Sequence, residues 1–233
     1  IRLSLVGSEM CIRDRFWCVP EGHKLVGIDA SGLELRMLAH YMRDDNYTNE
    51  ILSGDIHTAN MKAAGLTDRS QAKTFIYAFL YGAGAAKIGQ IVGGGYKEGQ
   101  QLIDSFLRNT PALARLRERV AKFSAGGTLP SLDGRRLRVR SEHAALNTLL
   151  QGAGAVVMKQ ALVLLIQRLS TYDIPHKLVA NVHDEFQIEV PENFASVVGK
   201  AAVRAIRDAG TELNLRCPLD GEYKIGNNWA ETH

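Results

Sequence analysis

Residues 178–190, "LVANVHDEFQIEV", combine a β-strand pattern with an unusual set of charged residues. Aliphatic and β-branched residues lead up to the centre, and Phe186 and Ile188 alternate with polar residues after it, which predicts a β-hairpin with one buried face. The connection consists of His183, Asp184 and Glu185, without the Gly or Asn that tight hairpin turns favour. Either this connection is a plain polar turn, or the hairpin presents two adjacent carboxylates for chemistry.

The composition is that of a globular protein without a dominant charge. The 233 residues are 45% hydrophobic and 23% charged, enough for one large or two small domains. A net charge of +3 permits a polyanionic partner but does not argue for one. Three cysteines without metal-ligand spacing favour a reducing, intracellular setting. The longest apolar run is interrupted by Lys159 and Gln160, so we expect no membrane span.

The order of predicted elements indicates an α+β fold. A buried strand at 23–31 carries Asp29 near its end, and helices are expected at about 97–109, 111–124, 141–170 and 192–209. Residues 128–140 contain an Asp-Gly turn between strand-like arms, which predicts a second hairpin. A coil-like tail is expected after the last helix. Strands come singly or in pairs between helices, which favours α+β over a regular βαβ alternation.

One predicted helix, within residues 67–84, carries cations and aromatic rings on one stripe. Arg69, Lys73, Tyr77 and Tyr81 are spaced four apart, so they lie nearly above one another over about 18 Å. Two cations followed by two rings suit a ligand with phosphates at one end and a base or sugar at the other. A solvated basic face beside core aromatics is the structural alternative.

The three acids form the second candidate site. Carboxylates that converge repel one another unless they are protonated or bridged by a cation, and oxygen-only ligands suit Mg²⁺. Asp29 emerges where a buried strand ends, and Asp184 and Glu185 lie at the hairpin tip. The spacing alone does not establish that the acids meet, because 155 positions separate Asp29 from Asp184. A helix cap and a polar turn remain the alternatives.

Further polar residues are candidates for nucleic-acid contacts. Asn147 and Gln151 lie one turn apart on an otherwise apolar helix, where amides can reach minor-groove acceptors or satisfy neighbouring groups. The segment "DGRRLRVR" carries four arginines, among them Arg135 and Arg136, which suit a phosphate grip or an exposed strand edge. His57 and His183 could touch phosphates or serve the local structure.

Three long segments together resemble a known family. "VGIDASGLELRMLAHYM" (26–42), "RSQAKTFIYAFLYGAG" (69–84) and "VHDEFQIEV" (182–190) are similar, in order, to motifs A, B and C of the family A DNA polymerases. The amino-acid sequence of these segments is especially similar to the phage replicative branch of the family, which includes enzymes that use host thioredoxin as processivity factor. The similarity extends over about 15–233. It implies template-directed addition of deoxynucleoside triphosphates to a primer 3′-hydroxyl with two Mg²⁺ ions.

The resemblance also implies roles for individual residues. Asp29, Asp184 and the carbonyl of Ala30 would hold the metal ions, with Glu185 supporting the site and Lys73 acting in catalysis. The nucleotide would be bound by Arg69, Lys73, Tyr77, His57 and Glu34, the last of which would exclude a 2′-hydroxyl. Primer–template DNA would be contacted by Tyr81, Asn147, Gln151, His183, Arg135 and Arg136.

The same resemblance predicts the domains. Residues 15–56 and 141–233 would form a palm that carries motifs A and C, and 57–140 would form helical fingers with motif B and the connecting hairpin. A thumb and an exonuclease domain have no counterpart here, so we expect this chain alone to be weak or inactive. Thioredoxin would bind through the missing thumb. Residues 1–14 match no family motif and are predicted to be foreign or disordered.

Two other functions stay open at this level, and both have a counterargument in the sequence. A single-subunit RNA polymerase relative would have no use for the sugar-excluding Glu34. A non-catalytic nucleic-acid-binding relic would not need Asp29, Lys73 and Asp184 intact. A phage-encoded polymerase would work in the host cytoplasm.

Overall fold

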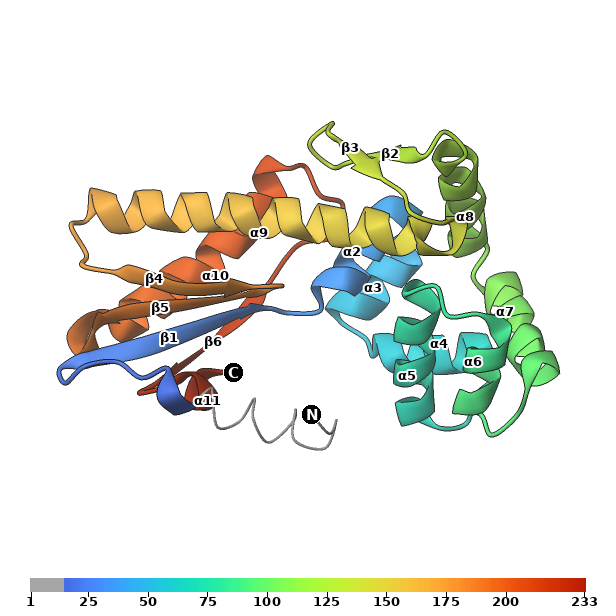
Figure 1. Ribbon diagram of the computed structural model, residues 1–233, viewed down its shortest axis with the longest axis horizontal. Coiled ribbons are helices and arrows are strands. Elements are labelled where there is room, and N and C mark those ends of the chain that lie inside the picture. Colours follow the sequence, from blue (N-terminus) through green and yellow to red (C-terminus); the bar gives the residue numbers. More distant parts are fainter. Residues whose placement is uncertain (1–14) are drawn as a thin grey trace. The chain divides into compact units, whose positions relative to one another are not determined.

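The computed structural model describes residues 15–233, which divide into two compact units (Figure 1). Unit 1 combines the described residues up to Leu33 with Ala155–His233, and unit 2 comprises Glu34–Gly154. The fold mixes helices with small antiparallel sheets, so the α+β prediction is confirmed. The functional boundaries predicted near 57 and 141 stay a prediction. The segment 1–14 lies outside the described residues.

Unit 1 is built on a four-stranded antiparallel sheet. Its strands are β1 (His23–Ala30), β4 (Lys177–Val182), β5 (Glu185–Pro191) and β6 (Gly221–Gly226), in the order β4-β5-β1-β6. The predicted hairpin is confirmed, because β4 and β5 pair across a connection of His183 and Asp184. His183 takes a φ of 54°, the left-handed conformation that the reversal needs in the absence of glycine.

The prediction of a coil-like tail was wrong. Residues 221–226 form β6, which pairs with β1 along its whole length, and residues 229–232 form the helix α11 (Trp229–Thr232). The strand pattern here is short and glycine-flanked, so it gives only a weak local signal. Pairing with β1 stabilises β6, and it also covers the edge of β1 that would otherwise be open.

Helices cover both faces of this sheet. Helix α10 (Ala195–Glu212), entered through the 3₁₀ turn η2 (Glu192–Phe194), packs across β1 and β6. The absence of a Cβ at Gly199 admits the ring of Tyr223, which is paired with Ile28 and so marks the α10 face. Gly27 is one residue earlier on β1 and faces α11, because successive strand residues point to opposite faces.

The long predicted helix is confirmed as α9 (Ala145–Thr171), after the 3₁₀ turn η1 (Glu142–Ala144). Residues 142–171 are long and apolar enough to cross a membrane by length and composition, and half of the most apolar window is buried inside the protein. Core helices of soluble proteins share this composition. The absence of a membrane segment therefore stays a prediction.

Unit 2 is largely helical. It contains α2 (Leu33–Met42, from Glu34 on), α3 (Asp45–Leu52), α4 (Ile56–Ala64), α5 (Arg69–Leu80), α6 (Ala85–Ile91), α7 (Tyr96–Asn109) and α8 (Pro111–Ser124). The predicted second hairpin is present as β2 (Thr128–Pro130) and β3 (Arg136–Arg138). Phe75, Phe79 and Phe106 pack edge-on or tilted in the core, with ring centroids 5.1 to 5.9 Å apart. This packing fixes the buried side of α5 and leaves its cations outside.

We expect Gly27→Ala to destabilise unit 1 strongly. A Cβ at this position would lie 2.6 Å from Nε2 of Gln187 and closer still to the backbone oxygen of Thr232. Overpacking of this kind costs about 1–3 kcal/mol, which in a chain of this size corresponds to a fall of roughly 2–12 °C in the melting temperature. Thermal unfolding followed by circular dichroism measures it. Gly84→Ala is the control, since a Cβ there meets nothing within 4 Å; equal melting temperatures for both variants would contradict the close docking of α11.

Candidate active site

Strand pairing places three carboxylates in a row across unit 1. The register sets Asp29 of β1 opposite Glu185 of β5 on one side and Glu222 of β6 on the other. Directly opposed residues in antiparallel strands have Cβ atoms about 4.5–5.5 Å apart and point to the same face. The backbone N–H of Ala30 donates to the backbone oxygen of Asp184 at 3.0 Å, which brings the hairpin tip to the same end of β1. The structure thus brings together Asp29, Ala30, Asp184 and Glu185.

The electrostatics of this row disfavour a fully ionised state. Partial burial, followed by the negative charges of Asp184, Glu185 and Glu222, raises the pKa of Asp29 to about 6. His233 acts in the opposite direction and lowers it. The acids therefore form an oxygen-only cluster whose mutual repulsion a bound cation would relieve. Within residues 15–233, no group of three or more His, Cys, Asp or Glu side chains is arranged closely enough to mark a metal site by itself.

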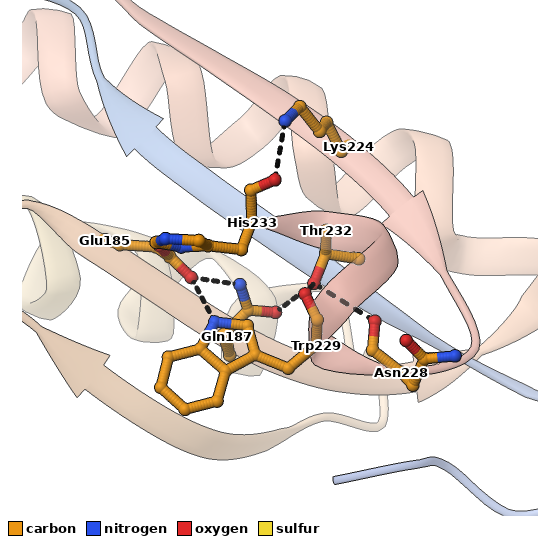
Figure 2. A network of polar contacts seen from close by, with 7 residues as sticks. All are labelled: Glu185, Gln187, Lys224, Asn228, Trp229, Thr232 and His233. Carbon is orange, nitrogen blue, oxygen red and sulfur yellow. Dashed lines mark hydrogen bonds and ion pairs between the residues drawn. The ribbon is translucent and has the colours of Figure 1, made fainter. Parts of the chain in front are cut away.

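Glu185 differs from the other acids because hydrogen bonds surround it (Figure 2). Its side chain is buried, and one carboxylate oxygen accepts from the indole Nε1 of Trp229 at 2.8 Å and from the amide of Gln187. The other oxygen lies 2.6 Å from Nδ1 of His233. This arrangement agrees with a supporting position beside Asp29.

In unit 2, the N-terminal half of α5 gathers the predicted phosphate-binding side chains. Arg69 is held by Asp55, with Nε and Nη2 donating to the two carboxylate oxygens at 2.8 and 3.1 Å. Burial and the nearby charges of Arg69 and Lys73 lower the pKa of His57, whose buried Nδ1 has no hydrogen-bond partner in the described part of the chain. Lys73 is exposed one turn after Arg69. Two cations and a neutral imidazole therefore share one region.

The two rings lie toward the C-terminus of α5, with Tyr77 inside the helix and Tyr81 as its C-cap residue. Tyr77 lies between His57 and Tyr81, with ring centroids 6.4 Å away in each case, and the planes of the two tyrosine rings are inclined by 29°. The hydroxyl of Tyr81 donates to a carboxylate oxygen of Glu34 at 2.7 Å, and the side-chain amide of Gln151 donates to the same oxygen. Glu34, Tyr81 and Gln151 are thus joined, although they come from α2, the end of α5 and α9.

The other predicted DNA contacts are scattered. Asn147 is half-buried one turn before Gln151, and His183 is exposed at the tip of its hairpin in unit 1. Arg135 is engaged locally, because its Nε donates to Asp133 at 2.6 Å. Arg136 is exposed on β3. The structure does not bring these residues into one cluster within either unit.

Sequence reasoning missed the partners of the predicted residues. Asp55 caps α4 by accepting from the backbone of His57 and Thr58, and a capping Asp before a helix is a signal that the sequence offers. That it also holds Arg69 depends on the packing of α4 against α5. Trp229 and His233 gave no local signal, because their contact with Glu185 spans more than 40 residues of chain.

Comparison with known proteins places the chain in a family. The family model of DNA polymerase family A matches residues 6–231, so this chain belongs to that family. The matched range includes part of the segment 1–14, whose foreign origin stays a prediction.

Phage polymerases are among the similar proteins. The chain is 48% identical to the DNA-directed DNA polymerase of Enterobacteria phage T3 and 49% identical to that of Escherichia phage T7. Each alignment covers 89% of this chain and 33% of the relative, so the chain spans about a third of their length. The fold is similar to the POL domain of Pol1 from M. smegmatis, solved with DNA primer-template and dNTP, with a TM-score of 0.82 at 23% identity over 92% of this chain and 41% of that one.

Proposed function

We propose that the protein carries out template-directed DNA synthesis, adding deoxynucleoside monophosphates from dNTPs to a primer 3′-hydroxyl, in phage replication. In this reaction the primer oxygen bonds to the α-phosphorus, the bond to the bridging oxygen breaks, and pyrophosphate leaves. The observation that carries the proposal is the row of Asp29, Glu185 and Glu222 with Asp184 beside it, in a chain of DNA polymerase family A.

The donor set fits Mg²⁺. Asp29, Asp184 and the Ala30 carbonyl offer hard oxygen ligands, and a divalent cation would favour the ionised form of Asp29, whose pKa is raised first by partial burial and then by the neighbouring negative charges. Two such ions would neutralise the phosphates and lower the pKa of the attacking hydroxyl. The carboxylates give the site a negative charge, and the pairing of β1 with β5 and β6 holds these acids next to one another. We therefore assign Asp29, Ala30 and Asp184 as ligands for two Mg²⁺ ions.

Unit 2 supplies nucleotide binding. Arg69 and Lys73 carry fixed positive charge for the triphosphate, and His57 adds a nitrogen donor or acceptor beside them. The paired rings of Tyr77 and Tyr81 offer a surface for sugar and base. We assign Glu34, which accepts hydrogen bonds from Tyr81 and Gln151, to the rejection of a 2′-hydroxyl on the sugar. Charge, stacking and exclusion together select a deoxynucleoside triphosphate.

The remaining assignments concern DNA. We assign Gln151 and Asn147 to the minor groove, His183 to the primer terminus, and Arg135 and Arg136 to backbone phosphates. Binding of a processivity factor such as thioredoxin and a location in the host cytoplasm stay predictions from the sequence.

Primer extension by the full-length gene product, meaning the whole protein encoded by the gene that contains this sequence, tests the proposal. We expect Mg²⁺-dependent extension that requires a template and prefers dNTPs. Synthesis with ribonucleotides and no primer would instead support an RNA polymerase. DNA binding without any synthesis would support a non-catalytic role and would overturn the proposal.

We expect Asp55→Asn to raise the KM for dNTPs roughly two- to fivefold with little change in kcat, which is the range expected for the loss of an exposed ion pair. Asn keeps the capping ability but removes the charge that holds Nε and Nη2 of Arg69. Steady-state extension with single dNTPs measures the effect. Asp44→Asn, at the cap of α3, is the matched control because Asp44 caps its helix in the same way. A lower KM would show that Asp55 competes with the triphosphate for Arg69 and would contradict the positioning role.

A further inference from the structure

We propose that the helix α11 acts as a positioning element for the active site, with Trp229 as the residue that orients the carboxylate of Glu185. This inference rests on the proposed function, because it concerns an acid beside the proposed Mg²⁺ ligands. It adds a role for residues outside the motifs that carry the family resemblance in the sequence.

Three donors converge on Glu185 from the α11 side of the sheet (Figure 2). The indole of Trp229 and the amide of Gln187 share one carboxylate oxygen, and the imidazole of His233 contacts the other. A carboxylate with both oxygens occupied in a buried site cannot rotate without losing a charge-assisted hydrogen bond. The orientation of Glu185 is therefore set by its partners on and after α11.

A second route joins α11 to Glu185. The hydroxyl of Thr232 donates to the side-chain oxygen of Gln187 at 2.8 Å, and this leaves the amide nitrogen of Gln187 to donate to Glu185. Gln187 is 1% exposed and Thr232 is 4% exposed, so neither polar group has water as an alternative partner. The chain Thr232–Gln187–Glu185 consequently fixes which end of the Gln187 amide faces the carboxylate.

The strands of the carboxylate row hold α11 in place. The absence of a side chain at Gly27 of β1 admits Thr232, and Nζ of Lys224 on β6 donates to the backbone oxygen of His233 at 2.8 Å. The strand that carries Asp29 thus also seats the helix that orients Glu185. Because the charge of Glu185 acts on Asp29, a free Glu185 would change the field at the proposed metal ligands.

Trp229→Phe in the full-length gene product tests the proposal. Phe keeps an aromatic ring but removes the N–H donor, so we expect the extension rate at fixed Mg²⁺ to fall roughly ten- to a hundredfold, as for a lost hydrogen bond to a charged group. The Mg²⁺ concentration for half-maximal rate should rise as well. Trp17→Phe is the control, because Trp17 lies edge-on against the ring of Trp229 and is not among the donors to Glu185. An unchanged rate and Mg²⁺ requirement in Trp229→Phe would overturn the proposal.

A double-mutant cycle separates positioning from general stability. If Trp229 acts through Glu185, then Trp229→Phe should have little further effect on the rate once Glu185 is replaced in Glu185→Gln. Additive losses would overturn the proposal. If Trp229→Phe does not fold, Thr232→Val takes its place, since it removes the hydroxyl that aligns Gln187 and should shift the Mg²⁺ requirement in the same direction.

An NMR experiment on the 233-residue chain gives a readout that does not depend on activity. The chain has two tryptophans and therefore two indole N–H signals. Glu185→Gln should shift the signal of Trp229 and speed its exchange with solvent, while that of Trp17 changes less. Two unshifted signals would overturn the proposal. Lack of extension by the wild-type protein would instead count against the proposed function, and the NMR result would still decide whether Trp229 holds Glu185.

Discussion

Asp29→Asn and Asp184→Asn should each abolish primer extension by the full-length gene product, with a loss of roughly a thousandfold or more. Asn keeps the shape of the side chain but not the charge that a divalent cation needs, and metal ions contribute several kcal/mol to such reactions, each ~1.4 kcal/mol being about tenfold. Binding of primer–template should stay close to normal, because these acids hold metal and do little for the duplex. Single-turnover extension and fluorescence anisotropy with labelled DNA measure the two effects.

The row itself supplies the matched control. Glu222 lies opposite Asp29 on the same face but is not assigned as a ligand, so Glu222→Gln should retain most of the activity. Near-normal turnover of either Asp variant in Mg²⁺ would show that the metal assignment is wrong. Equal losses in all three variants would mean that the total charge of the cluster matters more than the identity of the ligands.

The wild-type enzyme should incorporate dideoxynucleotides readily, and Tyr77→Phe should make it reject them by roughly ten- to a hundredfold or more. Tyr77 stands one turn after Lys73, between His57 and Tyr81, where its ring can border the 3′ position of the sugar. With Phe, the 3′-hydroxyl of the substrate must supply the polar contact that the phenol otherwise makes. A net hydrogen bond contributes about 0.5–1.5 kcal/mol, and an unsatisfied buried partner costs about 1–3 kcal/mol.

Competition between dideoxy and deoxy substrates decides this prediction, because the ratio of incorporation is independent of the amount of active enzyme. Tyr96→Phe is the matched control, since Tyr96 is 67% exposed at the start of α7. We expect the wild-type ratio in that variant. The same ratio in wild type and Tyr77→Phe would mean that Tyr77 is a structural aromatic and that α5 does not lie over the nucleotide.

Much of the site could be predicted because its residues lie on elements with strong local patterns. The hairpin of β4 and β5 follows from alternation around Asp184, and the α5 stripe follows from residues four apart that the structure keeps on one helix. These periodicities follow from the backbone geometry of helices and strands, so they can be read from the sequence without knowing the long-range contacts. The resemblance to family A polymerases rests on the same segments.

The tail shows where local reasoning failed. Residues 221–226 carry little strand signal, and α11 is only one turn long, so β6 is stable only when paired with β1, and α11 only when packed against β1 and β6. Unpaired, a short segment of this kind loses more conformational entropy on ordering than its own hydrogen bonds return. A coil-like tail was therefore the natural expectation from sequence, and this prediction missed the roles of Trp229 and His233.

By itself, the sequence determined which acidic, basic and aromatic residues are candidates for the site, and on which helix or hairpin each one lies. The tertiary structure alone decided that Asp29 and Glu185 face each other, because the register of β1 with β5 depends on pairing between residues 156 positions apart in the chain. It also decided that Glu185 is held by Trp229 and Arg69 by Asp55. Local periodicity sets the direction of a side chain, whereas the partner it meets depends on long-range packing, which only the folded chain supplies.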